Sequence, residues 1–331
     1  MYWSLSCRRW CAVRLGRGVI GPLKTFAKAV LPRSVVERLK MLKRQTHPES
    51  WPPVEFDNSY PWLNHTWSEL FANSRCWGKP MYIWGVLQGA ALARVLGISR
   101  ISVIEFGVAG GHGLITLEAI AESVEQRTDV AIDVFGFDTG VGLPKPVDYR
   151  DQPNKWFEGQ LPMDKERLQA KLRRAKLYLG PVAETVPAWL AEHHEPVGFV
   201  SHDLDLYTST QHALQLFGAD YDRVLPRVIT YFDDIFGHTY NDDCGERLAI
   251  GEYNEVNNDR KLRPIYGLRY FAPRICRDEL WPDGMYWAHF FEHPMYNAQD
   301  KICMNVAMDI EGKVIWRRPD ANWRREAGLD R

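Results

Sequence analysis

The sequence predicts an α/β protein built around a mostly parallel β-sheet. Beyond Ser99, short runs of β-branched and apolar residues alternate with longer amphipathic stretches, which is the pattern of βαβ units. A glycine-rich turn follows the first of these runs, and acidic residues follow several others. The chain has 331 residues, of which 45% are hydrophobic, so it can bury the core of one large domain.

The alternation places the elements in order along the chain. Strands are predicted near 101–106, 132–137, 176–179, 197–202 and 227–232. Helices are predicted over 113–125, 164–175, 183–193, 209–218 and 244–257. Three later segments, 265–271, 285–291 and 302–309, are predicted as further strands that complete a mixed sheet.

The part before Ser99 is organised differently. Residues 46–62 contain four prolines and no sustained period, which is typical of a linker, whereas the pattern from Thr66 to Gly97 is helical. We therefore predict a basic N-terminal extension over 1–50, a helical cap over 51–98 and the main domain over 99–331.

Residues 1–45 form a basic leader, with eleven Lys and Arg residues against the single acid Glu37. The rest of the chain has thirty bases against forty-one acids, so the net charge of −1 conceals two oppositely charged parts. Apolar residues between Leu23 and Leu42 recur at helical spacing, so the leader could lie on an anionic membrane surface. A solvated arm is the alternative.

The sequence indicates a cytoplasmic protein. Lys24 and Lys28 interrupt the apolar stretch after Arg17 and no small-residue cleavage pattern follows, so we expect no secretory signal. No apolar run is long enough to cross a bilayer. The six cysteines contain no CxxC pair and no zinc-like spacing; they are Cys7, Cys11, Cys76, Cys244, Cys276 and Cys303.

The first predicted strand leads into a glycine-rich loop, ISVIEFGVAGGHGLI. Glycines there let the backbone approach a ligand and leave the amides at the helix N-terminus pointing at it. His112 stands at the third glycine position of the dinucleotide fingerprint, which therefore does not fit. The spacing matches instead an acid-x-Gly-x-Gly-x-Gly loop, with Glu105, Gly107, Ala109 and Gly111 in register. A tight turn without a ligand is the alternative.

Asp138 ends the second predicted strand, in FGFDTGVGLP. An acid at that position could accept hydrogen bonds from two ribose hydroxyls, because open α/β sheets bind nucleotides at the carboxyl ends of their strands. The two acids and the glycines together predict a nucleotide-like ligand, with Glu105 under its charged end.

Paired acids follow two further predicted strands. Asp203 and Asp205 follow one, and Asp233 and Asp234 follow the next. Adjacent parallel strands would bring the pairs together, and carboxylates repel one another unless a cation lies among them. An all-oxygen set favours Mg²⁺ or a similar divalent ion, which would activate a coordinated hydroxyl. Capping of the following helices is the alternative.

In this order, the motifs resemble the macrocin O-methyltransferases, a family of class I S-adenosylmethionine-dependent methyltransferases. The matching segments are IEFGVAGGHG, FGFDTGVGLP, LGPVAETVPAWL, HDLDLYTST and YFDDIFGHTYNDDCGERLAIGEY, which span roughly 100–257. The resemblance implies a Rossmann-like fold with a mostly parallel seven-stranded sheet, helices on both faces and an N-terminal helical cap.

The resemblance also implies cofactors and roles. It implies S-adenosylmethionine as methyl donor, bound by Glu105, Gly107, Ala109, Gly111, Asp138 and Glu184. It implies Mg²⁺ held by Asp203, Asp233 and Asp234, with Asp205 as the catalytic general base. The Gly-Asp pair usual in the family before the Glu184 segment is Gly180-Pro181 here.

The predicted function is therefore O-methylation of a hydroxyl on a sugar or another small natural-product or glycan acceptor. Nucleic acid is not an expected partner, whereas membrane contact through residues 1–45 and a homo-oligomer remain open. A nicotinamide-dependent sugar oxidoreductase would need the dinucleotide glycine spacing and a Tyr-Lys pair, and neither is found. A non-catalytic module attached through the leader would not need the paired acids.

Overall fold

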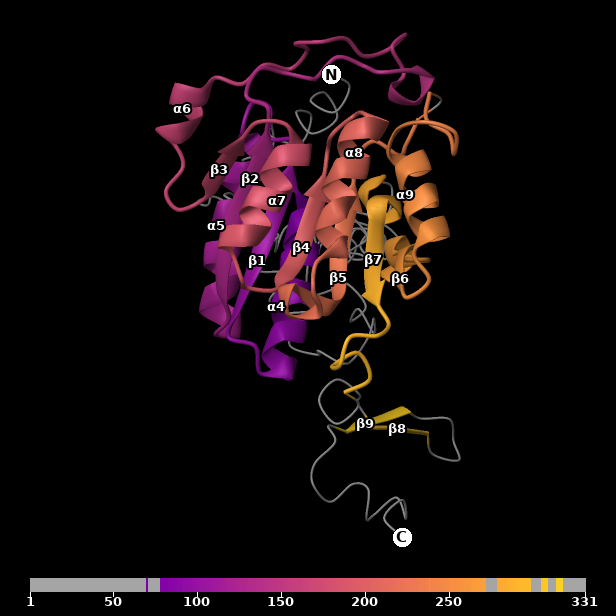
Figure 1. The fold of residues 1–331 in the computed structure, drawn as a ribbon. Coiled ribbons are helices and arrows are strands. Elements are labelled where there is room, and N and C mark those ends of the chain that lie inside the picture. Colours follow the sequence, from indigo (N-terminus) through magenta and orange to yellow (C-terminus); the bar gives the residue numbers. More distant parts are fainter. Residues whose placement is uncertain are drawn as a thin grey trace, which may run out of the picture. The chain divides into compact units, whose positions relative to one another are not determined.

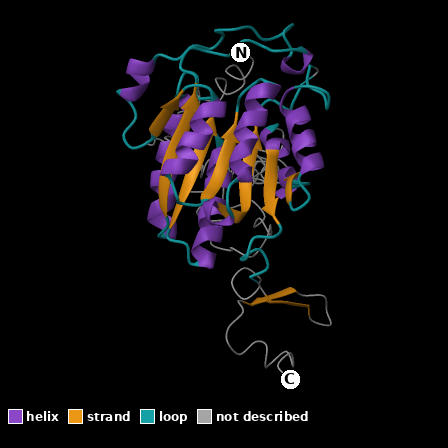
Figure 2. Ribbon diagram, in the orientation of Figure 1, coloured by secondary structure: helices purple, strands orange, loops and turns teal. Residues whose placement is uncertain are grey.

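The computed structural model describes Leu70 and residues 78–237, 239–271, 279–298, 305–308 and 314–317. Within these ranges the chain forms a seven-stranded sheet in the order β3-β2-β1-β4-β5-β7-β6, with helices on both faces (Figures 1 and 2). The first five strands along this order are parallel, and β7 runs antiparallel to both β5 and β6. This is the Rossmann-like arrangement of class I methyltransferases, so the predicted fold class is confirmed.

The five parallel strands follow the sequence pattern closely. They are β1 (Arg100–Phe106), β2 (Ala131–Asp138), β3 (Lys176–Leu179), β4 (Val197–His202) and β5 (Val224–Phe232). Strands β1 and β4 lie inside the sheet and are buried almost throughout, because helices cover both of their faces. Their continuous apolar runs are the reason that the sequence located them.

The two antiparallel strands are β6 (Arg260–Pro264) and β7 (Met285–Phe290). The predicted strand over 265–271 was wrong, because the strand lies earlier and the chain then forms the short helix α10 (Leu268–Phe271). Gly267, with φ of +78°, turns the chain out of the extended conformation between them. As an edge strand, β6 has the sequence RKLRP and so lacks the apolar run expected of a strand.

The predicted strand over 302–309 also differs from the structure. Strand β8 (Asn305–Met308) pairs antiparallel with β9 (Val314–Arg317) in a separate two-stranded sheet, and does not complete the main sheet. The backbone groups of each strand that face the other are paired with it, and within the described residues neither strand pairs with the main sheet. The remaining residues of the predicted strand lie outside the described ranges.

The helices between the strands are α5 (His112–Thr128), α6 (Lys165–Gln169), α7 (Val182–Glu192), α8 (Tyr207–Ala213) and α9 (Gly245–Val256). Short 3₁₀ helices span Tyr149–Asp151, Leu214–Gly218, Tyr221–Arg223 and Trp281–Gly284. None of the helices in the described ranges is long and apolar enough to cross a membrane.

Helix α6 is shorter than the predicted helix over 164–175. The reason is the buried Glu118, whose Oε1 accepts hydrogen bonds from the backbone amides of Arg173, Arg174 and Ala175. Those amides would otherwise bond to carbonyls one turn earlier in a helix. A side chain from α5 thus ends the helix, which no local pattern in the sequence indicates.

Helix α4 (Pro80–Leu96) belongs to the predicted helical cap over 51–98, yet it packs directly on the sheet, against β4 and β5. Two glycines allow this close approach. A Cβ at Gly85 would lie 2.2 Å from the ring of Phe199, and one at Gly89 would lie 2.6 Å from the carbonyl oxygen of Gly198. Of the rest of the predicted cap, only Leu70 and residues 78–79 and 97–98 are described, and the basic extension over 1–50 lies outside the described residues.

The contact between α4 and β4 generates a stability prediction. Gly89→Ala should destabilise the fold by about 1–3 kcal/mol, because backbone rather than a flexible side chain stands where the methyl group would go. Gly251→Ala in α9 is the matched control, since nothing lies within 4 Å of its Cβ position, and it should stabilise by up to about 1 kcal/mol. Urea unfolding measures both, and equal effects would refute the close-packing argument.

Candidate functional site

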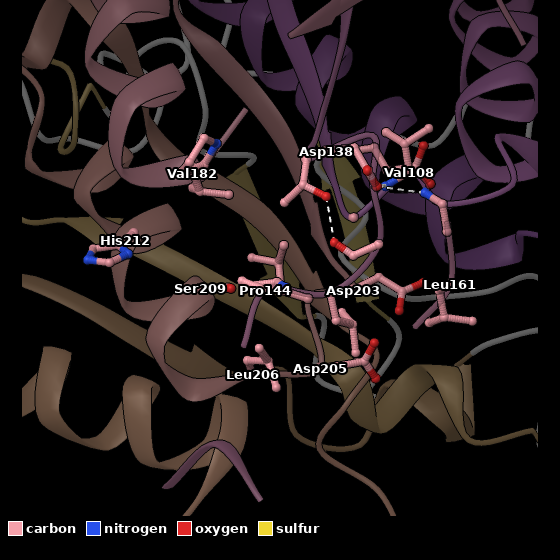
Figure 3. A pocket seen from close by; sticks show the side chains of 18 of the residues that line it. Val108, Asp138, Pro144, Leu161, Val182, Asp203, Asp205, Leu206, Ser209 and His212 are labelled. Carbon is pink, nitrogen blue, oxygen red and sulfur yellow. Dashed lines mark hydrogen bonds between the residues drawn. The ribbon is translucent and has the colours of Figure 1, made fainter. Parts of the chain in front are cut away.

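A cavity of about 530 Å³ lies at the carboxyl edge of the parallel strands (Figure 3). Its wall is made by the glycine loop after β1, the end of β2, the start of α7, the residues after β4 and the first turns of α8. The volume lies within the usual range of cofactor and ligand sites. Of the predicted site residues, Glu105, Gly107, Ala109, Gly111, Asp138, Asp203 and Asp205 line it.

The glycine loop has the conformation that its sequence predicts. Gly107 and Gly111 have φ near +83° and +82°, and Ala109 also has a positive φ, of +44°. A Cβ at Gly107 would lie 1.8 Å from the carbonyl oxygen of Asp203, so only glycine lets the loop after β1 pass the loop after β4. This contact holds the glycine loop, at one end of the cavity, against the loop after β4, at the other end.

Glu105 lies buried at the end of β1 with one carboxylate oxygen unpartnered. Its Oε1 accepts a hydrogen bond from the hydroxyl of Tyr82, on α4, at 2.6 Å, whereas Oε2 has no partner in the described structure. Burial raises the pKa of Glu105 to about 7 although the Lys79 ammonium opposes the shift. A buried carboxylate oxygen without a partner, on a cavity wall, suits a cationic ligand group such as an ammonium.

Asp138 holds the glycine loop in place. Its Oδ2 accepts hydrogen bonds from the backbone amides of Val108 and Ala109, at 3.0 and 2.8 Å, and its Oδ1 accepts one from Gly140 at 2.6 Å. In Figure 3, Asp138 and Val108 lie beside one another at one end of the cavity. A carboxylate has about four acceptor positions, so about one remains for a ligand hydroxyl, where the sequence analysis expected two such bonds.

The two predicted pairs of acids meet at the other end of the site. Asp203 and Asp205 lie side by side on the cavity wall (Figure 3). The backbone amide of Asp205, a residue with φ of +62°, donates to Oδ2 of the buried Asp234 at 2.9 Å. Asp233 accepts from the hydroxyl of Tyr231 at 2.7 Å, and neither Asp233 nor Asp234 lines the cavity.

Glu246, in the first turn of α9, is a member of this cluster that the sequence analysis missed. Its side chain is fully buried and accepts hydrogen bonds from the backbone amides of Asp234, at 3.0 Å, and Leu204, at 3.4 Å. One carboxylate therefore joins the loop after β4 to the loop after β5. The sequence does contain a signal for Glu246, because this residue belongs to NDDCGERLAIGEY, part of one of the segments that carry the family resemblance.

The capping interpretation of the acids does not hold for α8 and α9. Their N-cap residues are Leu206 and Cys244, and neither helix has a side-chain cap hydrogen bond. The acids instead contact backbone amides, tyrosines and one another.

Burial and mutual repulsion disfavour the ionised form of these acids. Burial first, and then neighbouring carboxylates, raise the pKa of Asp203, Asp205 and Glu246 above the ordinary values, and burial followed by the charge of Asp233 raises that of Asp234. The chemistry of the set suits a hard divalent cation. Within the described ranges, however, no three Asp, Glu, His or Cys side chains converge closely enough to hold a metal ion.

A long segment, residues 139–164, crosses over this edge of the sheet between β2 and α6 (Figure 1). It is tethered to the body at Asp151, which accepts hydrogen bonds from the amide and hydroxyl of Thr208, and at Lys155. The Lys155 ammonium contacts the hydroxyl of Tyr240, which donates to Oδ1 of Asp234 at 2.6 Å. A lysine far along the sequence thus supplies positive charge beside the acidic cluster.

Other residues singled out in the sequence lie apart from this arrangement. Glu184 is exposed in the first turn of α7 and does not line the cavity, although Val182 and Ala183 do, so its adenine contact stays a prediction. His112 lines the cavity. His202 is buried in the sheet and stacks on Phe232 with ring centroids 4.4 Å apart, which is a structural role. His238 lies outside the described residues.

No protein-family model and no curated protein matches the chain. Among solved structures, CalS11, a calicheamicin methyltransferase, is 21% identical and aligns over 83% of this chain and 98% of that one, with a TM-score of 0.44. Apo CalS11, described as a TDP-rhamnose 3'-O-methyltransferase, is 22% identical over 70% of this chain and 95% of that one, with a TM-score of 0.37.

An O-methyltransferase from Bacillus cereus, solved with SAH, is 14% identical over 65% of this chain and 91% of that one, with a TM-score of 0.31. At these identities the likenesses concern the fold alone.

Proposed function

We propose that the protein is an S-adenosylmethionine-dependent O-methyltransferase that acts on a hydroxyl of a sugar or another small natural-product or glycan acceptor, as the macrocin O-methyltransferases do. The observation that carries this proposal is a single cavity that joins the glycine loop and Asp138 at one end to Asp203 and Asp205 at the other. The methyl donor would occupy the first end of this cavity, and the acceptor would occupy the acidic end. The predicted cytoplasmic location belongs to the same proposal.

The cofactor end of the cavity suits the donor's two polar parts. The unpartnered Oε2 of Glu105 would take the ammonium of the methionine moiety, and the remaining acceptor position of Asp138 would take a ribose hydroxyl. Val182 and Ala183 offer an apolar surface for the adenine ring. S-adenosylmethionine supplies a methyl group on a sulfonium, which is electrophilic without further activation.

The acidic end would prepare the acceptor. Asp205, on the cavity wall, would accept the proton of the acceptor hydroxyl, while Asp203 would help to orient that hydroxyl toward the methyl group. Contacts of the backbone fix the positions of both acids. The amide of Asp205 donates to Asp234, and the carbonyl of Asp203 lies against Gly107. Fixed positions lower the entropic cost of alignment.

A divalent cation belongs to the proposal as a finer part. Asp203, Asp233 and Asp234 would hold it, and it would supply a positive charge that favours ionisation of the acceptor hydroxyl. The support is chemical: the charges of Asp233 and Asp234 help to raise the pKa of Asp203, that of Asp233 helps to raise the pKa of Asp234, and a cation would relieve this repulsion. Their side chains would have to converge further to bind it.

The cofactor site is tested by calorimetric titration with S-adenosylmethionine and S-adenosylhomocysteine. Asp138→Ala should weaken both at least about tenfold, because it removes a ligand contact and releases the loop amides. Asp133→Ala, on the same strand but at an exposed pair with Arg100, should leave affinity unchanged. Glu184→Ala tests the predicted adenine contact. Absence of binding by the unaltered protein would refute the methyltransferase proposal.

Glu105 should make cofactor affinity depend on pH. Only its ionised form pairs with an ammonium, and its pKa of about 7 means that affinity falls as the pH drops through this value. We expect a loss of about tenfold between pH 8 and pH 6, measured by the same titration. Glu105→Gln should bind weakly and without this dependence. Tyr82→Phe removes a hydrogen bond that lowers the pKa, so the midpoint should move to higher pH; an unchanged profile in Glu105→Gln would contradict the assignment.

Cation binding can be measured without turnover, by electron paramagnetic resonance titration with Mn²⁺. Asp203→Asn and Asp234→Asn should each weaken Mn²⁺ binding at least about tenfold, because each removes a negatively charged oxygen ligand. Asp222→Asn, an exposed acid on the 3₁₀ helix Tyr221–Arg223, is the matched control. Unaltered Mn²⁺ affinity in the first two variants would exclude the proposed cation site while leaving the cofactor site intact.

A further inference from the structure

The wall of the cavity carries an excess of acids. Among the described residues, five carboxylates line it, against two lysines, Lys79 and Lys145, and no arginine. The five acids are Glu105, Asp138, Asp151, Asp203 and Asp205. An anionic group of a ligand is repelled in such surroundings unless a cation lies close to it.

The ligand proposed for this cavity contains a carboxylate of its own. In S-adenosylmethionine, the ammonium and the carboxylate of the methionine moiety are bonded to the same carbon atom. If the ammonium lies against the unpartnered Oε2 of Glu105, the carboxylate therefore lies next to it. The site then needs a base beside Glu105.

Lys79 lies at this position. It directly precedes helix α4 and lines the cavity. Its ammonium lies over the ring of Tyr82, 5.0 Å from the centroid, and the hydroxyl of the same tyrosine donates to Oε1 of Glu105 at 2.6 Å. One buried side chain thus contacts both the base and the acid. Among the described residues the ammonium forms no ion pair with a carboxylate, so it is available to a ligand.

The backbone at Lys79 is fixed beside the glycine loop. The carbonyl oxygen of Lys79 accepts hydrogen bonds from the amides of Tyr82 and Ile83, at 3.0 and 3.3 Å. A Cβ on the preceding Gly78 would lie 3.8 Å from Cε1 of His112, the first residue of α5. The N-terminus of α5 has no side-chain cap, and its free amides and helix dipole favour an anion. Two sources of positive charge are therefore adjacent.

The charge of Lys79 acts on three groups of the cavity wall. Burial raises the pKa of Glu105, and Lys79 has the largest opposing effect. Burial also raises the pKa of Asp203, which Lys79 again opposes, and burial followed by Lys79 lowers that of His112. Lys145 is exposed on segment 139–164 and is not among the causes of these shifts. Lys79 is thus the lysine that lies nearer to Glu105 in electrostatic terms.

We propose that Lys79 binds the carboxylate of the methionine moiety while Glu105 binds its ammonium. This assignment rests on the proposed function, because it specifies how the same site holds the methyl donor. A base and an acid fixed by one tyrosine would recognise the two opposite charges of an amino acid together. The amides in the first turn of α5 would add to the attraction for the carboxylate. A donor without the carboxylate would leave Lys79 without its partner.

The test is calorimetric titration of the full chain with S-adenosylmethionine and with decarboxylated S-adenosylmethionine, which lacks only the carboxylate. The ratio of the first affinity to the second isolates the contact with that group, since the other contacts are common to both ligands. Lys79→Met removes the ammonium, keeps the aliphatic stem and should lower the ratio at least about tenfold. Lys145→Met is the matched control, because it removes one positive charge from the same cavity wall and should leave the ratio unchanged.

A fall of the ratio in Lys79→Met alone supports the proposal, and Lys79→Gln decides in its place if circular dichroism shows that Lys79→Met is misfolded. An unchanged ratio would mean that Lys79 only shapes the cavity, and an equal fall in both lysine variants would mean a general effect of charge. Either result overturns the assignment while the unaltered protein still binds S-adenosylmethionine, so the proposed function stands. Absence of binding by the unaltered protein refutes the proposed function and the assignment with it.

Discussion

Hydrogen bonds from backbone amides to buried and half-buried carboxylates hold the carboxyl edge of the sheet together, and the rest of the site depends on them. A parallel sheet ends there in loops whose amides have no strand partner, and a buried amide without a partner is costly. Asp138 satisfies amides of the loops after β1 and β2, and Glu246 those of the loops after β4 and β5. Asp138 and Glu246 therefore have a structural role that does not depend on a bound ligand.

Grouping these carboxylates has an electrostatic cost, because their negative charges repel one another. Five acids, Asp203, Asp205, Asp233, Asp234 and Glu246, follow one another around a small region, and most have raised pKa values. The positive charge of Lys79 opposes the rise in the pKa of Asp203, and that of Lys155 opposes the rise in the pKa of Asp205. The cluster is therefore bounded by cations on two sides, one at the start of α4 and one in the segment 139–164.

The sequence predicts the inner part of the molecule better than its rim. The positions of Glu105, Asp138 and Asp203 follow from counting residues to the ends of buried apolar strands, and the structure places all three on the cavity. Tyr82, Lys155 and Tyr240 could not be located in the same way. Tyr82 lies on a helix that the sequence predicts, but no local pattern shows that its hydroxyl reaches Glu105. Lys155 and Tyr240 lie in segments without a periodic signal, so only the fold brings them to the site.

Two errors in the predicted secondary structure have a similar cause, a contact with a segment distant in the sequence. Helix α6 ends early because Glu118 from another helix captures its amides, and β6 was missed because an edge strand needs no apolar run. In both places a partner distant in sequence decides the local conformation. Local propensity is a weak guide wherever such a partner exists.

The tethering of segment 139–164 has a consequence for ligand affinity. The segment is fixed to the body through Asp151 and Lys155, and its two arms are hydrogen-bonded to one another beside the cavity that the segment helps to line. A segment that is already held in place has less conformational entropy to lose when a ligand binds, so affinity is gained through preorganisation. Asp151 and Lys155 would thus contribute to affinity by fixing part of the cavity wall.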